Sequence, residues 1–399
     1  MLKKYHFNFI LFLFPALCFG QIVNNNPETI SYNWYIQAKW DSLLTNRNTL
    51  LSNGNDYYYM RYRLGEAAYR TGKYRQAATD FARAAALNSN DSFSTSFYAH
   101  SLLLAGRLSE AILIGENLRK QKSTNAQYYK SVQLNSLYCE YGNKFSSDKN
   151  ISGNLSFFQV ATGLQALPSA NLFVAFSSLI NSNYYSEVRQ KIYFAKLKLQ
   201  LKNAWSLEPY FNYIDASVGF YPTKDYPLTY SYYLQNQVFG LSVLKSFSKW
   251  DINFGGTYSN LSNNTQIQAN TGLTFYPKAN NSLFAALQLT YHNENDGSNT
   301  SQNLLIRPSA GFKLAKNLWF TSEFYYGKAY NFVENSGYLV NNAVDLTKWR
   351  LNSGLQYYPS KMFSFFLTYQ HEARQEKLFS SPYSLNSIFI GVRYNPWSR

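Results

Sequence analysis

The segment KIYFAKLKLQLK, residues 191–202, separates apolar from cationic side chains residue by residue. Leu197 and Leu199 fall on one side of an extended chain and Lys196 and Lys198 on the other, because successive residues of a β-strand point to opposite faces. The same alternation recurs through residues 170–397, with no helical period in between. We therefore predict an antiparallel transmembrane β-barrel whose apolar faces contact lipid and whose polar faces line the interior.

The alternating segments predict a barrel of about 12 strands. Residues 151–162 also alternate; they are either a linker or plug segment or, with a partner strand near residues 134–141, they make a barrel of about 14 strands. Short connections alternate with long polar ones, which places the short ones and the C-terminus on the periplasmic side. The candidate strands are residues 170–182, 187–202, 207–221, 231–247, 250–260, 265–277, 281–293, 301–315, 318–330, 345–359, 363–375 and 384–397.

The composition and the N-terminus favour an exported protein. Aromatic residues make up 18% of the chain and charged residues 15%, which suits a barrel with aromatic girdles better than a cytosolic enzyme. Residues 1–20 resemble a secretory signal, with Lys3 and Lys4 before an apolar stretch and a small-residue cleavage site at Gly20. Cys18 also suggests a lipoprotein, but the preceding Leu17 is larger than the residue that such signals carry.

After cleavage Cys139 is the remaining cysteine, so we expect no intrachain disulfide and no thiol-ligated metal. No later segment reaches the roughly 18 consecutive apolar residues of a membrane-spanning helix. The formal net charge is +15, but the basic residues form no block, which makes nucleic acid an unlikely partner.

Residues 31–145 are predicted to be helical and repeated. Residues 64–91 and 98–118 match at a fixed offset: Gly106 follows Gly72 by 34 residues. A period of this length in paired helices is typical of tetratricopeptide repeats, and the segment resembles that family. Residues 34–51 and 127–142 are predicted as flanking helices that close the stack. The predicted packing positions are Leu64, Gly65, Gly72, Tyr74, Ala77, Phe81 and Ala84 in the first copy and Ala99, Gly106, Leu108 and Ala111 in the second.

The tetratricopeptide resemblance implies a concave groove that binds a protein or peptide partner. The alternative is that the helices brace the barrel or dock a neighbour.

The predicted strand register turns many charged side chains toward the lumen. They either form an internal network of ion pairs and hydrogen bonds that closes the barrel, or line a lumen that conducts anions or polysaccharide. In the second case the inward aromatic residues Trp319, Tyr325 and Phe366 would stack on sugar rings. The predicted lumen charges are Lys196, Lys198, Lys202, Arg307, Lys313, Glu323, Lys348, Arg350, Glu372, Arg374 and Arg393, together with Asp215 and Asp251.

No motif predicts catalysis. His292 and His371 lie near the predicted outer rim, but neither has a G-x-S-x-G nucleophile or a suitably spaced acid beside it. His100 is expected to be a packing or surface residue of the repeats. We find no metal-binding cluster, phosphate loop or dinucleotide fingerprint, and we predict neither a cofactor nor an enzyme.

The predicted order is a signal at residues 1–20, helical repeats at 31–145, a linker or extra strand at 146–168 and the barrel at 169–399. Repeats followed by a C-terminal barrel resemble the YaiO-type outer-membrane family and, more distantly, the repeat-plus-barrel porins of exopolysaccharide export. The resemblance implies an integral outer-membrane protein with a periplasmic docking arm that serves transport, export or assembly of surface material. The alternatives are a plugged barrel that anchors a scaffold for periplasmic partners and, least favoured, a lipid-modifying hydrolase at the rim.

Overall fold

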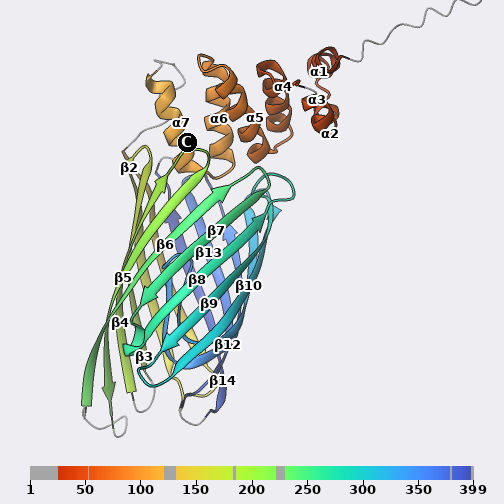
Figure 1. Ribbon diagram of the computed structural model, residues 1–399. Coiled ribbons are helices and arrows are strands. Elements are labelled where there is room, and N and C mark those ends of the chain that lie inside the picture. Colours follow the sequence, from red (N-terminus) through yellow and green to blue (C-terminus); the bar gives the residue numbers. More distant parts are fainter. Residues whose placement is uncertain are drawn as a thin grey trace, which may run out of the picture.

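The computed structural model describes residues 26–52, 54–120, 132–182, 186–221, 230–377 and 380–396. In these residues an N-terminal helical region is followed by a closed β-barrel, and the helices stand over one end of the barrel (Figure 1). We call this end the helical end and the opposite one the far end. The predicted signal at residues 1–20, with Cys18, lies outside the described residues.

The helical region contains seven α-helices within the described residues. Helix α6 begins 34 residues after α4, and α7 begins 34 residues after α5, which is the period expected from the sequence. Gly72 and Gly106 form the turns within the two pairs at φ values of 72° and 75°, a left-handed conformation that glycine adopts without a Cβ clash. The helices are α1 (Pro27–Ile36), α2 (Trp40–Thr45), α3 (Arg47–Leu51), α4 (Tyr58–Arg70), α5 (Tyr74–Leu87), α6 (Ser92–Leu104) and α7 (Leu108–Lys120). Among the described residues, no helix is both long enough and apolar enough to cross a bilayer.

Small and large residues alternate where the paired helices pack. The Gly65 backbone lies against the Phe81 ring, at which a Cβ would meet ring carbons 3.0 Å away. Of the predicted packing positions, Leu64, Gly65, Ala77, Phe81, Ala84, Ala99 and Ala111 are buried, whereas Gly72 and Tyr74 are half-buried and Gly106 and Leu108 are exposed.

The barrel has fourteen strands within the described residues, all antiparallel, and β1 pairs with β14 to close it. The preferred count of about 12 was wrong, and the alternative of 14 is confirmed. The strands are β1 (Gln133–Ser146), β2 (Asn154–Leu167), β3 (Ala170–Ser182), β4 (Ser186–Gln200), β5 (Trp205–Phe220), β6 (Tyr230–Ser246), β7 (Trp250–Ser259), β8 (Thr265–Phe275), β9 (Leu283–Asn295), β10 (Thr300–Ala315), β11 (Leu318–Glu334), β12 (Leu339–Tyr357), β13 (Phe363–Gln375) and β14 (Pro382–Tyr394).

The two additional strands correct the predicted boundaries. Residues 127–142 were predicted as a flanking helix, but β1 begins at Gln133. The error has a simple cause: Leu134, Leu137, Tyr138 and Tyr141 match the i, i+3, i+4, i+7 spacing of a helix as well as they match a strand. Residues 146–168, predicted as a linker or an extra strand, hold a loop and the strand β2, so the barrel begins near residue 133 and not at 169.

The short connections and the end of β14 share the helical end. The turn between β8 and β9 contacts the helices, because Asn280 donates a hydrogen bond to the Gly72 carbonyl. Strands alternate in direction, so the turns β2–β3, β4–β5, β6–β7, β10–β11 and β12–β13 lie at this end too. The connection lengths predicted this grouping.

The barrel wall has an apolar outer face and a mainly polar inner face. Tyr193, Leu241 and Ile390 are exposed on the outside, whereas Gln159 and Gln268 are buried inside. Asp215 was predicted to face the lumen and lies instead on the outer face, between the buried residues 214 and 216 and opposite Lys191 on β4.

Candidate functional site: an inward hairpin above a vestibule

The lumen is filled by a hairpin made from the far ends of β11 and β12. Strand β11 pairs with β10 only as far as Tyr326, opposite Ile306, and β12 pairs with β13 only from Leu346. Beyond these points the two strands pair with each other, and their turn at residues 335–337 has φ values of 50°, 52° and 85°. We call residues 328–345 the plug hairpin.

The tip of the plug hairpin reaches the opposite wall. Asn212 on β5 donates a hydrogen bond of 2.9 Å to the Gly337 carbonyl, and the Tyr338 hydroxyl donates one of 2.6 Å to Gln159 on β2. A Cβ at Gly337 would lie 2.3 Å from the Tyr210 ring, so only glycine fits at this point of contact. In the barrel order, β5 stands six strands away from β11, so the hairpin spans the lumen.

Polar side chains of several strands hold the arms of the plug hairpin. The Val333 amide donates to the Gln268 side chain at 2.8 Å, and the Gln268 amide donates to the Val333 carbonyl at 3.4 Å. Asn331 donates to Glu294 at 3.1 Å, and Asn342 donates to Gln190 on β4 at 3.4 Å. These bonds satisfy backbone and amide groups that are buried or half-buried in the lumen.

Ion pairs fix the residue that precedes the hairpin turn to the wall. Glu334, which is buried, lies 2.5 Å from the guanidinium of Arg350 and 3.3 Å from that of Arg307. Arg307 is also 3.5 Å from Glu323. In a second cluster Glu372 pairs with Lys144 at 2.8 Å and with Arg374 at 2.5 Å.

Apolar packing seals the space between these polar groups. Phe332 is fully buried, and its ring stacks on that of Tyr325 with the centroids 4.8 Å apart. Tyr338 packs edge-on against Phe173 and Phe194 from β3 and β4. Tyr325 is therefore occupied by the hairpin and does not present a free ring to the lumen.

Of the remaining predicted lumen charges, all but Lys348 lie nearer the helical end. Lys196 and Lys198 pair with Glu208 at 3.4 and 3.3 Å, and the Arg393 guanidinium lies over the rings of Tyr138 and Phe366. Lys313 faces the Trp319 ring, Lys202 is exposed in the turn after β4, and Lys348 lies at a β-bulge between Thr347 and Trp349.

Four ionic residues were missed, three in these clusters and one, Arg75, at the contact between the helices and the barrel. Lys144 was hidden by the helix prediction and Glu334 fell in a predicted loop. Arg75 was treated as part of a helical repeat, and Glu208 lay two residues into its predicted strand without being noticed as a partner for the lysines of β4.

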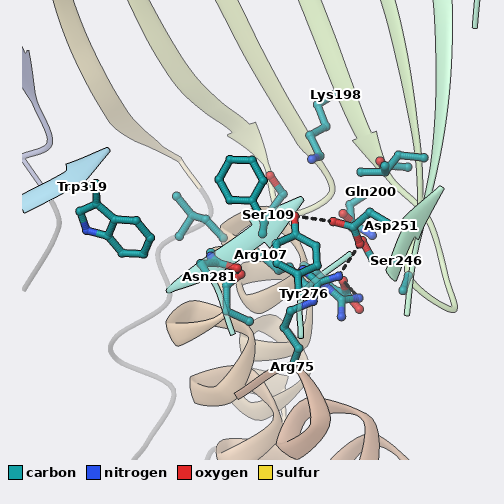
Figure 2. A pocket seen from close by; sticks show the side chains of 18 of the residues that line it. Arg75, Arg107, Ser109, Lys198, Gln200, Ser246, Asp251, Tyr276, Asn281 and Trp319 are labelled. Carbon is teal, nitrogen blue, oxygen red and sulfur yellow. Dashed lines mark hydrogen bonds and ion pairs between the residues drawn. The ribbon is translucent and has the colours of Figure 1, made fainter. Parts of the chain in front are cut away.

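Between the plug hairpin and the helices lies a cavity of about 540 Å³, which we call the vestibule. Helical residues including Arg107, Ser109 and Glu110 form its floor, and strand residues including Lys198, Gln200 and Trp319 form its walls (Figure 2). Arg107 forms an ion pair with Glu110, and Lys198 with Glu208, so the charges are largely compensated. The accessible surface of the vestibule combines aromatic rings with amides and hydroxyls.

Arg75 of α5 joins the helical floor to the barrel. Its side chain is 2% exposed, forms an ion pair with Asp251 and lies 3.9 Å from the centroid of the Tyr276 ring (Figure 2). It also donates to the carbonyls of Ser248 and Phe247 at 3.1 and 3.0 Å. Asp251 was predicted to be a lumen charge, and it takes part in this contact between the helices and the barrel.

The histidines do not converge on one site. His292 is fully buried on the inner face, whereas His371 lies on the outer face, bonded to Asn386 at 2.8 Å and beside the Trp349 ring. His100 contacts the Tyr69 hydroxyl at 2.9 Å in the helical region, where burial lowers the pKa of its imidazole. Within the described residues, no group of three or more His, Cys, Asp or Glu side chains could hold a metal ion.

No protein-family model matches the chain, and no curated protein matches it. Solved structures of barrels are similar at low identity. The CymD monoaromatic hydrocarbon channel is 8% identical with a TM-score of 0.48, covering 68% of this chain and 90% of CymD. A FadL homologue of Pseudomonas aeruginosa is 7% identical with a TM-score of 0.43 (68% and 92% covered), and Omp33 of Acinetobacter baumannii is 8% identical with a TM-score of 0.36 (66% and 98% covered). Likenesses this weak carry no argument about function, and the tetratricopeptide and YaiO-type resemblances stay predictions.

Proposed function

We propose that the chain is an integral outer-membrane barrel that takes part in transport or export of surface material, with its helices in the periplasm and its lumen closed by the plug hairpin at rest. The apolar outer face supports the membrane location, because a lipid-exposed wall needs apolar side chains. The strands are 10 to 19 residues long, and about 9–11 tilted residues suffice to cross the hydrocarbon core.

The connection lengths support the orientation. Outer-membrane barrels have short periplasmic turns and longer external loops. The short turns and the helices share one end of this barrel, so the helices belong in the periplasm. There they can dock a protein or peptide partner on the surfaces that face away from the barrel.

The observation that carries the transport proposal is that a separate hairpin, and not the wall itself, fills the lumen. Side chains alone fill a barrel of about eight strands, whereas barrels of about 16–18 strands leave an aqueous channel. Fourteen strands enclose more space than the wall residues occupy, and residues 328–345 occupy the part of it that lies beyond the vestibule. A hairpin that fills a lumen in this way can leave it without unfolding the barrel.

The vestibule supports a polar, uncharged cargo such as a polysaccharide. Its ion pairs are internal, and Trp319 and Phe284 offer ring faces beside the amides of Gln200 and Gln356. Apolar faces of sugar rings stack on aromatic side chains while their hydroxyls bond to amides. We propose no enzymatic activity and no cofactor.

A second function, a plugged anchor for periplasmic partners, is favoured by the number of strands that hold the hairpin. Conductance in planar bilayers separates the two. We expect the wild-type barrel to be closed and a variant with residues 329–345 replaced by a short Gly-Ser turn to conduct. A matched control replaces the β9–β10 turn, residues 296–299, and should stay closed.

The fold of each variant is checked by its heat-modifiable migration in detergent. If the variant with the shortened hairpin is folded and still does not conduct, the transport function is refuted and the plugged anchor is favoured.

A further inference from the structure

The inward course of the plug hairpin leaves one edge of the barrel wall uncovered. Strand β10 pairs with β9 from Thr300 to Phe312, but with β11 only from Ile306 onward. Among the described residues, Thr300–Leu305 therefore have no ladder partner on the β11 side. An open strand edge presents unpaired N–H and C=O groups and readily accepts another strand.

The first arm of the plug hairpin has the sequence to fill this edge. Continuing the existing pair of Ile306 and Tyr326 by antiparallel register places Leu304 opposite Lys328 and Thr300 opposite Phe332. Side chains alternate along a strand, so Tyr330 and Phe332 would then face outward, in line with Tyr326 and Leu304. Ala329 and Asn331 would face inward beside Asn303 and Ser301, as the polarity of the wall requires.

We propose that residues 327–332 can occupy two positions. In the first, which we call the lumen seat, they lie inside the barrel as in the structure. In the second, which we call the wall seat or second seat, they pair as a strand with residues 300–305 of β10. Moving from the first to the second withdraws the tip of the hairpin from Tyr210 and opens the lumen. This inference rests on the proposed function for its consequence, the opening of a conduit, but not for the existence of the second seat.

Gly327 is placed to be the hinge between the seats. Its φ is 144°, and an added Cβ would lie 2.7 Å from Leu305 Cδ2 and 2.9 Å from the Leu304 carbonyl oxygen. A residue with a side chain is strained in this conformation but not in an ordinary strand, where φ is about −140°. Gly327→Ala should therefore disfavour the lumen seat alone, and shift the balance toward the wall seat about 5- to 150-fold.

Disulfide trapping tests the second seat. The pair Thr300→Cys and Phe332→Cys, in a mature chain carrying Cys139→Ser, is directly opposed in the proposed register. In the lumen seat Phe332 is fully buried inside the barrel while Thr300 is exposed on the outer face. We expect this pair to crosslink under mild oxidation and to crosslink more in the Gly327→Ala background.

Two further pairs of cysteine substitutions serve as controls for the crosslinking yield. Ser301→Cys with Phe332→Cys is one residue out of register and should crosslink much less. Val333→Cys with Gln268→Cys joins residues that are bonded in the lumen seat, and should lock the hairpin inside. Equal yields for the in-register and out-of-register pairs, or no yield for the former in folded Gly327→Ala protein, would overturn the second seat.

The conductance of the trapped proteins separates this inference from the proposed function. A barrel trapped through residues 300 and 332 that conducts supports both. If the disulfide forms and the barrel stays closed, the second seat is supported and the transport function is refuted. If the barrel with the shortened hairpin conducts but the disulfide never forms, the transport function is supported and the second seat is refuted.

Discussion

Replacing Arg75 with alanine should release the helical region from the barrel without unfolding either part. Arg75 is buried at the contact and is the residue through which α5 reaches the β6–β7 turn. The substitution removes an ion pair with Asp251, hydrogen bonds to the carbonyls of Phe247 and Ser248, and the stacking on Tyr276.

The size of the destabilisation depends on the Asp251 carboxylate, which the substitution leaves without its cation. Removing one partner of a buried ion pair destabilises by roughly 3–5 kcal/mol, because the other charge stays buried without compensation. The lower end applies here, since Asp251 keeps a hydrogen bond of 3.0 Å from the Tyr276 hydroxyl and its side chain is 15% exposed. A loss of about 3 kcal/mol raises the ratio of undocked to docked molecules about 100-fold.

The docking hydrogen bonds that remain, one of them from the Arg75 backbone amide to the Ala279 carbonyl at 2.9 Å, are neutral and should not compensate. Asn280 donates to the Gly72 carbonyl and Asn281 to the Ala105 carbonyl, each at 2.9 Å. Bonds of this kind contribute only about 1 kcal/mol each.

Electron–electron distance measurements between spin labels can follow the release. One label replaces Arg70 on α4 and the other Lys316 in the β10–β11 turn, in a mature chain carrying Cys139→Ser. We expect a narrow distance distribution in the wild type and a broad one in Arg75→Ala. Arg83→Ala on the same helix is the matched control, because Arg83 is largely exposed and pairs with Asp56 at the surface. Identical distributions for Arg75→Ala and Arg83→Ala would refute the reasoning.

Three further predictions concern the helical region and are checked by thermal unfolding in detergent, followed by far-ultraviolet circular dichroism. Gly65→Ala should lower the free energy of unfolding by about 1–3 kcal/mol, because the new Cβ meets the Phe81 ring; an unchanged midpoint would show that the ring can move aside. Asp80→Asn should lower it by about 3–5 kcal/mol, since Arg47 and Arg61 both pair with this fully buried carboxylate, while Asp41→Asn at the exposed end of α2 should change little. Burial lowers the pKa of His100 below its usual 6.5, so the unfolded state binds the proton more tightly than the folded state. The contribution of His100 to the free energy of unfolding should therefore be complete above about pH 6.5 and be lost as the pH drops below it. A His100→Gln variant whose free energy of unfolding depends on pH as steeply as that of the wild type would contradict this.

The barrel could be predicted because its wall separates two environments along its whole length. Lipid contacts one face of each strand and the lumen the other, so the segment around Lys196 and Leu197 predicts a strand and its two faces from local sequence alone. The same reasoning failed for β1, where apolar residues satisfy a helical and a strand spacing together. Local periodicity cannot separate the two for a short segment.

The two faces of β5 are the reverse of those predicted, and the pattern along this strand alone could not have predicted this. Ile214 is fully buried on the inner face while Asp215 lies outside, because the lumen at this level is occupied by apolar parts of the plug hairpin and not by water. The hairpin residues Val333 and Tyr338 are more than one hundred residues away in sequence. A pattern read along one strand reports the polarity of its surroundings, but not which segment supplies them. The contact of Arg75 with Asp251 was missed for the same reason.

The buried charges around Glu334, directly before the turn of the plug hairpin, bear on whether the closure is permanent. A buried ion pair is weak evidence for stability, since apolar residues of similar volume often stabilise a protein as much or more. Glu334 lies between Arg307 and Arg350, so any shift of the hairpin within the lumen leaves the Glu334 carboxylate unpaired and leaves both arginines with Glu323 as their remaining partner in this cluster. The arrangement therefore selects one position for the hairpin more than it strengthens the closure. A permanent plug would be served better by aliphatic packing at these positions, whereas a closure that returns to the same place after each opening needs such selectivity. The ion pairs thus fit a hairpin that moves.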